Sequence, residues 1–354
     1  MKRIIIFFCL TSILISCSDD LVKKTNLEST FDMFWTYMDE HYVYFDEKKL
    51  NWDSLYKVYS PRVKSLKNED ELDSVFQNIL NQWSDYHVNI QTTKNSYITN
   101  SKLNHKYNEQ SPVVEKYNFE NYKYKTNEFY VVQNRERPYA YMKIETFEFS
   151  FYKELSLAMN QLSYDKGLII DLRKCNGGNL ENSVDFVSLF FNGEKTLFFK
   201  QPKTGKGKSD FGNLEPVKYI GLNIINAEIP LIVIADSSAY SAPNLCAFIL
   251  GDFLNTTVVG TNTGGGGSPT FTVLLPNGWK LTYPYLKLFS VSGKNMEYGL
   301  YPDVYHNFIS PRYSFNKRDD HIAIAMELLD SINNINGKNG YNYFDYKNMY
   351  QDHN

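Results

Sequence analysis

Apolar residues recur at helical spacing near the N-terminus of this 354-residue chain, which predicts a small helical subdomain within residues 18–90. One pattern begins at Ser29-Thr30, and a second begins at Asn68, where Glu71 follows at capping-box spacing. The apolar residues of each segment share one face: Phe31, Phe34, Trp35, Met38 and Tyr42 on the first, and Leu72, Val75, Phe76, Ile79, Leu80 and Trp83 on the second. We therefore expect two amphipathic helices.

The pattern changes at Pro138. Short apolar runs occupy 140–144, 167–172, 231–235 and 256–260, and amphipathic stretches of helix length separate them. This alternation indicates an α/β fold with parallel strands over residues 138–335. Residues 271–275 and 279–283 flank a Pro-Asn-Gly turn and predict a hairpin, while Asp319-Asp320 begin a last helix.

Between these two parts, residues 91–137 are polar and rich in Asn, Tyr and Lys. We interpret them as a variable linker segment with short β-prone pieces such as 128–133. Residues 336–354 form a C-terminal tail beyond the last helical pattern.

The first seventeen residues predict export. Lys2 and Arg3 precede an apolar run, 4–15, that is too short to span a bilayer. Leu14-Ile15-Ser16-Cys17 resembles the bacterial lipoprotein signal, which implies cleavage before Cys17 and a lipid on its thiol. The expected location is the bacterial cell envelope, lipid-anchored on the periplasmic or cell-surface side. An ordinary signal peptide with an incidental cysteine is the alternative.

Composition narrows the possible partners. A net charge of −3, from 37 basic and 40 acidic residues, gives no electrostatic reason to expect nucleic acid. The 28 Tyr and 24 Phe fit a core or a polymer-binding groove. Two cysteines remain in the body, Cys175 and Cys246, which permit one disulfide or two free thiols. No metal or other cofactor is expected, because the remaining histidines lack metal-site spacing: His41, His105, His306, His321 and His353.

The candidate chemistry centres on Ser241. The buried strand predicted at 231–235 leads through a small polar turn into a helix at 244–250. A hydroxyl at that helix start lies among backbone N–H groups suited to an oxyanion, so Ser241 is a candidate nucleophile. The alternative is that Ser241 only caps the helix.

Four other segments could contribute to the same site. The strand at 167–172 runs into Gly177-Gly178, where backbone N–H groups could face a ligand. Trp83-Ser-Asp-Tyr-His87 ends the second helix, and Met296-Glu297 precedes a turn. Gly264 to Gly267 lack the Lys-Ser/Thr of a phosphate loop, and a flap or close-approach loop fits them better. Taken singly, each is equally consistent with a turn or surface residue.

In this order the segments resemble the tail-specific, or C-terminal processing, serine peptidases, which share a catalytic core with tricorn protease and retinoid-binding repeats. The resemblance covers about residues 30–335 and implies a ClpP/crotonase-like core with an N-terminal helical subdomain. Many processing peptidases carry a PDZ module after the helical unit, and none is recognisable in 91–137.

The resemblance also suggests residue roles. The lysine of the processing branch would fall at Gly266, so the Ser/His/Glu arrangement of the tricorn-like branch fits better. It implies Ser241 as nucleophile, His87 as general base, Glu297 as its partner and Tyr86 as a possible relay. Backbone N–H groups of Ala242 and of Gly177 or Gly178 would form the oxyanion hole. Two residues beside the nucleophile depart from the family pattern: Pro243 and Asn244.

Asp171 and Arg173 flank the end of the strand at 167–172, where we expect a structural ion pair. The hypothesis that we favour is an envelope-anchored serine endopeptidase that acts on peptides or unfolded protein through an acyl-enzyme. A catalytically inactive protein on the same scaffold, binding peptide, lipid or glycan, is the alternative. An esterase is a third possibility, although the Gly-x-Ser-x-Gly elbow is missing.

Overall fold

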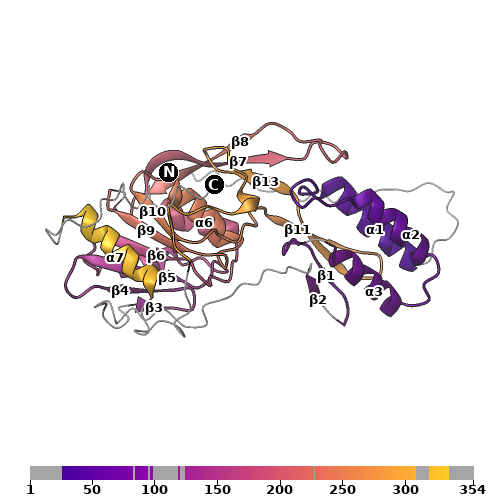
Figure 1. Ribbon diagram of the computed structural model, residues 1–354, viewed down its shortest axis with the longest axis horizontal. Helices are drawn as coiled ribbons and strands as arrows, with labels where there is room; N and C mark the ends of the chain where they lie inside the picture. Colours follow the sequence, from indigo (N-terminus) through magenta and orange to yellow (C-terminus); the bar gives the residue numbers. More distant parts are fainter. Residues whose placement is uncertain are drawn as a thin grey trace.

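The computed structural model describes residues 26–82, 84–94, 96–98, 119, 124–226, 228–307 and 319–334. The expected signal peptide with Cys17, most of the expected linker and the tail 336–354 lie outside these residues. In Figure 1 the N-terminal helices form one body, and a larger α/β core lies beside them. None of the described helices is long and apolar enough to cross a membrane.

A seven-stranded sheet forms the centre of the core. Its strands lie in this order: β14 (Val304–Tyr305), β10 (Thr256–Gly260), β9 (Leu231–Ala235), β6 (Gly167–Asp171), β5 (Tyr139–Ile144), β4 (Phe129–Gln133) and β3 (Tyr124–Lys125). The strands from β14 to β5 run parallel to one another. β4 pairs antiparallel with β5, and β3 pairs antiparallel with β4. Every residue of β6, β9 and β10 is buried, which explains their continuous apolar sequence. The predicted α/β fold is confirmed.

Helices cover both faces of this sheet (Figure 1). One face packs against α4 (Tyr152–Met159), α5 (Leu180–Ser188) and α6 (Ala242–Gly251), and the other packs against α7 (Asp320–Ile332). Side chains alternate along each strand, so Ile170 and Val233 belong to the first cluster and Ile169 and Ile232 to the second. The loops that leave the carboxyl ends of β6 and β9 therefore emerge side by side.

The helical subdomain contains α1 (Asn26–His41), α2 (Trp52–Val63) and α3 (Glu69–Leu80). The two predicted helices, α1 and α3, are present, and the Asn68 side chain accepts the Glu71 N–H at 3.0 Å as an N-cap. We did not predict α2, which buries only Trp52, Tyr59 and Val63 and has Pro61 inside it.

The helices pack on a four-stranded sheet in the order β11 (Thr270–Leu274), β12 (Lys280–Pro284), β1 (Asn89–Gln91) and β2 (Ser96–Ile98). The predicted hairpin is thus present as β11 and β12, but it packs against the N-terminal helices. Trp279 and Leu281 from this hairpin are buried in the same apolar cluster as Phe34 and Phe76. The helical subdomain is therefore completed by a segment that the sequence assigned to the core.

Two further parts of the fold differ from the expectation. Part of the segment interpreted as a linker enters the central sheet, because β3 and β4 extend it beyond β5. A third sheet, unpredicted, contains β13 (Leu286–Phe289), β7 (Asn192–Pro202) and β8 (Glu215–Leu222) in that order. Most of the β7 and β8 residues are at least partly exposed, so they lack the apolar runs that marked the other strands.

Candidate active site

Ser241 lies at the N-terminus of α6, six residues after the last residue of β9. Its φ of 71° and ψ of −121° are left-handed, a conformation that costs a non-glycine residue about 1–3 kcal/mol. The Ser241 N–H donates to the Gly265 carbonyl at 2.9 Å, which helps to hold this conformation. Its hydroxyl makes no capping hydrogen bond to α6, so the helix-cap alternative is not what the structure shows.

The imidazole of His87 faces that hydroxyl. His87 Nε2 lies 3.0 Å from Ser241 Oγ, although the two residues are 154 positions apart. The turn after α3 is held by Asp85, whose carboxylate accepts the His87 N–H at 2.9 Å and the Tyr42 hydroxyl at 2.7 Å. The helical subdomain therefore supplies the imidazole, and the core supplies the hydroxyl.

Burial sets the protonation state of His87. It lowers the pKa of the imidazole from its ordinary value of 6.5, while the charge of Asp85 raises it and that of Lys48 lowers it. A neutral imidazole is the form that can accept a proton from Ser241. His87 Nδ1 is buried without a hydrogen-bond partner among the described residues.

Two backbone segments, the start of α6 and the Gly177-Gly178 pair, lie at the cavity that Ser241 lines. Ala242 is the first residue of α6, so its N–H has no partner within the helix. A Cβ atom on Gly177 would lie 4.0 Å from that of Ser241, and one on Gly178 would lie 2.3 Å from the Phe147 carbonyl carbon. Gly177 and Gly178 have φ of 77° and 128°. These positive φ angles favour glycine, and both residues line the same cavity as Ser241.

Glu297 lies in the 3₁₀ helix η2 (Met296–Tyr298), and its side chain is 2% exposed. Its carboxylate pairs with Lys48 Nζ at 2.5 Å. Burial and the charge of Asp85 raise the pKa of Glu297 to about 8, against the opposing charge of Lys48. His87 Nδ1 makes no hydrogen bond to Glu297 or to any other described residue. Glu297 is therefore not the direct hydrogen-bond partner of the imidazole.

Tyr240 fills the position that a lysine would need. A Cβ atom on Gly266, where φ is 72°, would lie 2.3 Å from the Tyr240 ring. The centroid of the same ring lies 4.9 Å from the centroid of the His87 ring and 5.3 Å from that of the Tyr86 ring. Tyr86 thus packs edge-on against Tyr240 at the wall of the site. A residue with a side chain at 266 would have to displace Tyr240.

The glycine loop is a close-approach loop. A Cβ atom on Gly265 would lie 2.2 Å from the Glu297 carbonyl oxygen, so only glycine lets the two backbones meet. Asn244 fixes the same contact from the other side, because its amide donates to the Met296 carbonyl at 3.0 Å and accepts from Thr263 Oγ1 at 2.6 Å. Asn244 therefore has a structural role, and Pro243 fits the first turn of α6.

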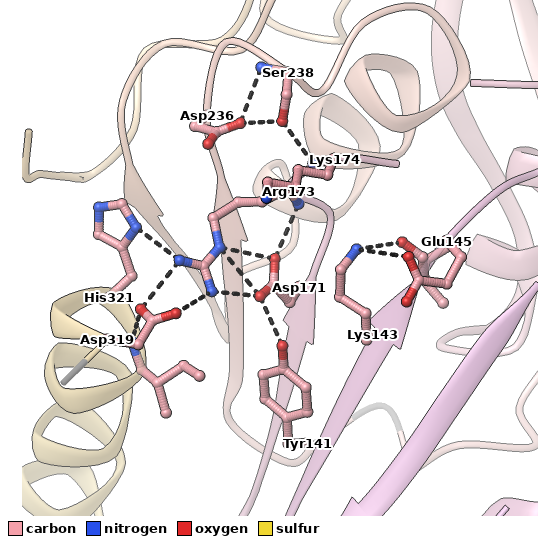
Figure 2. Close-up of polar contacts among 12 residues, drawn as sticks. Tyr141, Lys143, Glu145, Asp171, Arg173, Lys174, Asp236, Ser238, Asp319 and His321 are labelled. Carbon is pink, nitrogen blue, oxygen red and sulfur yellow. Dashed lines mark hydrogen bonds and ion pairs between the residues drawn. The ribbon is translucent and has the colours of Figure 1, made fainter. Parts of the chain in front are cut away.

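Figure 2 shows the buried network around Arg173. The guanidinium pairs with Asp171 at 2.5 Å and with Asp319 at 2.9 Å, and its NH1 donates to His321 Nδ1 at 3.2 Å. Burial raises the pKa of Asp171, but the Arg173 charge outweighs it and lowers the pKa to about 2. The expected structural ion pair is confirmed, and it ties the loop after β6 to the start of α7.

Cys175 and Cys246 are both free and buried. Burial raises the pKa of the Cys175 thiol to about 12 and that of Cys246 well above its ordinary value. Of the two possibilities left open by the sequence, the structure has free thiols. The described residues contain no cluster of three or more His, Cys, Asp or Glu side chains that could hold a metal ion.

A cavity of about 740 Å³ opens over Ser241 and His87. Gly177, Gly178 and Tyr240 line it together with these two residues. A hydroxyl, a general base and backbone donors thus meet one open space, as acyl transfer requires. Sequence reasoning missed two groups near this site: Lys48, which nothing in the sequence marks, and Asp85, visible only as part of the segment that ends at His87.

Comparisons with known proteins find similarity to peptidases. Residues 138–306 match Peptidase family S41, and residues 24–81 match the Tricorn protease C1 domain. A carboxyl-terminal-processing protease of Synechocystis sp. is 30% identical over 130 residues, which make up 36% of this chain and 28% of that protein. The match thus spans less than a third of that curated relative. The predicted family resemblance is confirmed.

Solved structures share the fold over most of the chain. A candidate peptidase from Parabacteroides merdae superimposes with a TM-score of 0.76 at 26% identity, over 86% of this chain and 97% of that one. Mature CPAF in complex with lactacystin has a TM-score of 0.63 at 10% identity, over 88% and 99% of the two chains. The second likeness is one of fold alone.

Proposed function

We propose that this chain, whose residues 138–306 match Peptidase family S41, is a serine endopeptidase that cleaves peptide bonds through an acyl-enzyme. The observation that carries the proposal is the 3.0 Å contact between Ser241 Oγ and His87 Nε2. It joins a strained, uncapped serine to an imidazole whose pKa is lowered by burial.

The chemistry follows from these positions. As Ser241 Oγ attacks the scissile carbonyl carbon, His87 Nε2 accepts the hydroxyl proton. The carbonyl oxygen gains negative charge, and the N–H of Ala242 with that of Gly177 or Gly178 stabilises it by roughly 3 kcal/mol for each donor. His87 then protonates the leaving amine, and a water molecule, deprotonated by the same imidazole, hydrolyses the acyl-enzyme.

Two buried carboxyl groups, those of Asp85 and Glu297, belong to the proposed arrangement around His87. Asp85 holds the backbone of His87, and its charge favours the imidazolium that forms when Ser241 is deprotonated. Glu297 is the third member of the proposed Ser/His/Glu arrangement, but it makes no direct hydrogen bond to the imidazole among the described residues, and its buried carboxyl pairs with Lys48.

Two substitutions test this proposal. We expect Ser241→Ala and His87→Ala each to abolish cleavage of an unfolded protein such as reduced casein, with unchanged melting temperatures. Ser209→Ala, which alters an exposed serine in the loop between β7 and β8, is the matched control and should retain full activity. A fluorophosphonate should label the wild type at Ser241. Persistent proteolysis by purified Ser241→Ala would exclude this nucleophile, and failure of both labelling and proteolysis in the wild type would favour the binding-protein alternative.

We also propose that the peptidase is lipid-anchored in the cell envelope. The support is the sequence Leu14-Ile15-Ser16-Cys17 after a basic start and a short apolar run. Expression of the full chain in bacteria with a labelled fatty acid should give a labelled product that partitions into detergent. Cys17→Ala should lose the label, and an unlabelled wild type would contradict the anchor.

A further inference from the structure

Ser238 joins the two loops that supply the oxyanion donors. One loop, residues 172–178, follows β6 and contains Gly177 and Gly178, and the other, residues 236–241, follows β9 and leads to Ser241. The Lys174 N–H donates to Ser238 Oγ at 2.6 Å, directly across the gap between these loops (Figure 2). Both Lys174 and Ser238 line the cavity above the nucleophile.

Asp236 fixes the hydroxyl that makes this contact. The Ser238 N–H donates to Asp236 Oδ1 at 2.9 Å, and Ser238 Oγ donates its own proton to the same oxygen (Figure 2). With its proton directed at Asp236, the Ser238 oxygen is left as an acceptor for the Lys174 N–H. The hydrogen bonds therefore run in one direction, from the Lys174 N–H through the Ser238 hydroxyl to a carboxylate.

The loop that donates this hydrogen bond, residues 172–178, depends on contacts with other parts of the fold to keep its conformation. Lys174 has φ of 55°, a left-handed conformation that an L residue keeps only when its surroundings impose it. On one side Arg173 anchors the loop through Asp171 and Asp319. On the far side the Gly177 carbonyl accepts the Phe147 N–H at 2.7 Å. The Ser238 contact links this loop to the nucleophile segment.

We propose that Ser238 is a positioning residue that sets the spacing of the two halves of the oxyanion hole. One donor, the Ala242 N–H, belongs to the nucleophile segment, and the other, from Gly177 or Gly178, belongs to the loop after β6. Both must reach a single oxygen, so a small change in the distance between the loops weakens their combined action. A bound peptide that has not yet reacted depends much less on this spacing. The inference rests on the proposed function.

The experiment separates transition-state from ground-state effects. We expect Ser238→Ala to lower kcat about tenfold, and to weaken inhibition by a peptide aldehyde by the same factor, because the hemiacetal oxygen occupies the oxyanion hole. KM should change less than twofold, as should the affinity for an intact peptide measured in the Ser241→Ala background. Ser238→Thr, which keeps the hydroxyl, should recover most of kcat, and Ser209→Ala should behave as wild type.

The possible outcomes distinguish this inference from the proposed function. If the wild type cleaves peptides and Ser238→Ala keeps both kcat and aldehyde affinity, the positioning role is refuted. Equal losses in kcat and in peptide affinity, or a fall of more than about 5 °C in melting temperature, would show that Ser238 serves binding or folding instead. Should the wild type show neither hydrolysis nor reaction with a fluorophosphonate, the proposed function itself is wrong.

Discussion

Glu297→Gln tests the electrostatics of the site through stability. The carboxyl of Glu297 is buried, and burial and the charge of Asp85 raise its pKa from 4.5 to about 8. The folded protein therefore binds this proton more tightly than the unfolded chain does. The stabilisation that this proton gives the folded state is complete below pH 4.5 and is lost as the pH rises through about 8. The free energy of unfolding therefore falls with rising pH in this window.

The magnitude follows from the two pKa values. At about 1.4 kcal/mol for each tenfold change in proton affinity, the difference between 4.5 and about 8 corresponds to about 5 kcal/mol at the limit. Between pH 5 and pH 8 the linkage relation gives a loss of about 3–4 kcal/mol. Glutamine does not titrate, so Glu297→Gln should remove this loss and leave only the pH dependence of the other groups.

The assay is urea unfolding of the wild type and Glu297→Gln at pH 5 and pH 8. The quantity to compare is how much the free energy of unfolding changes between the two pH values in each protein, because histidines titrate equally in both. Glu194→Gln, which neutralises an exposed carboxylate paired with Lys218 on the β7–β8 hairpin, is the control and should follow the wild type. Equal pH dependence in the wild type and Glu297→Gln would refute the reasoning.

Three further predictions concern the neighbouring groups. The pH profile of kcat/KM should rise with an apparent pKa below 6.5, because burial lowers the pKa of His87 and only the neutral imidazole accepts the proton; a midpoint above 6.5 would contradict this. Gly266→Lys should not restore proteolysis to His87→Ala and should lower the melting temperature, since its Cβ would lie 2.3 Å from the Tyr240 ring; recovered casein cleavage would show that the ring yields. Arg173→Met should destabilise the fold by about 3–5 kcal/mol in urea unfolding, because it removes the cation that pairs with two buried carboxylates, and a loss below 1 kcal/mol would be inconsistent with the network.

The sequence predicted the centre of the fold because that centre is buried on both faces. The apolar runs at 231–235 and 256–260 coincide with β9 and β10, in which every residue is buried. Where one face meets solvent the signal weakens, and β7 and β8 were missed. The hairpin of β11 and β12 was predicted from its turn, but local pattern cannot say which body a hairpin packs against.

The candidate site also contains residues that the sequence could predict and residues that it could not. Ser241 and His87 could be proposed from their segments and from the resemblance, and the structure places them 3.0 Å apart. Lys48 could not be proposed, because a lysine in a polar stretch resembles any surface residue until tertiary packing brings it to Glu297. The strain at Ser241 was equally invisible, since the left-handed φ depends on the contact with Gly265 and not on residue type.

The absence of a lysine at 266 and the presence of an imidazole at 87 have one steric cause. The Tyr240 ring occupies the space beside Gly266 that a lysine side chain would cross, and its centroid also lies 4.9 Å from that of the His87 ring. Tyr240 therefore excludes a lysine at position 266 and also packs against the imidazole of His87, the proposed base. It follows that the general base comes from the helical subdomain, so loosening that subdomain from the core should inactivate the site before the α/β fold itself is lost.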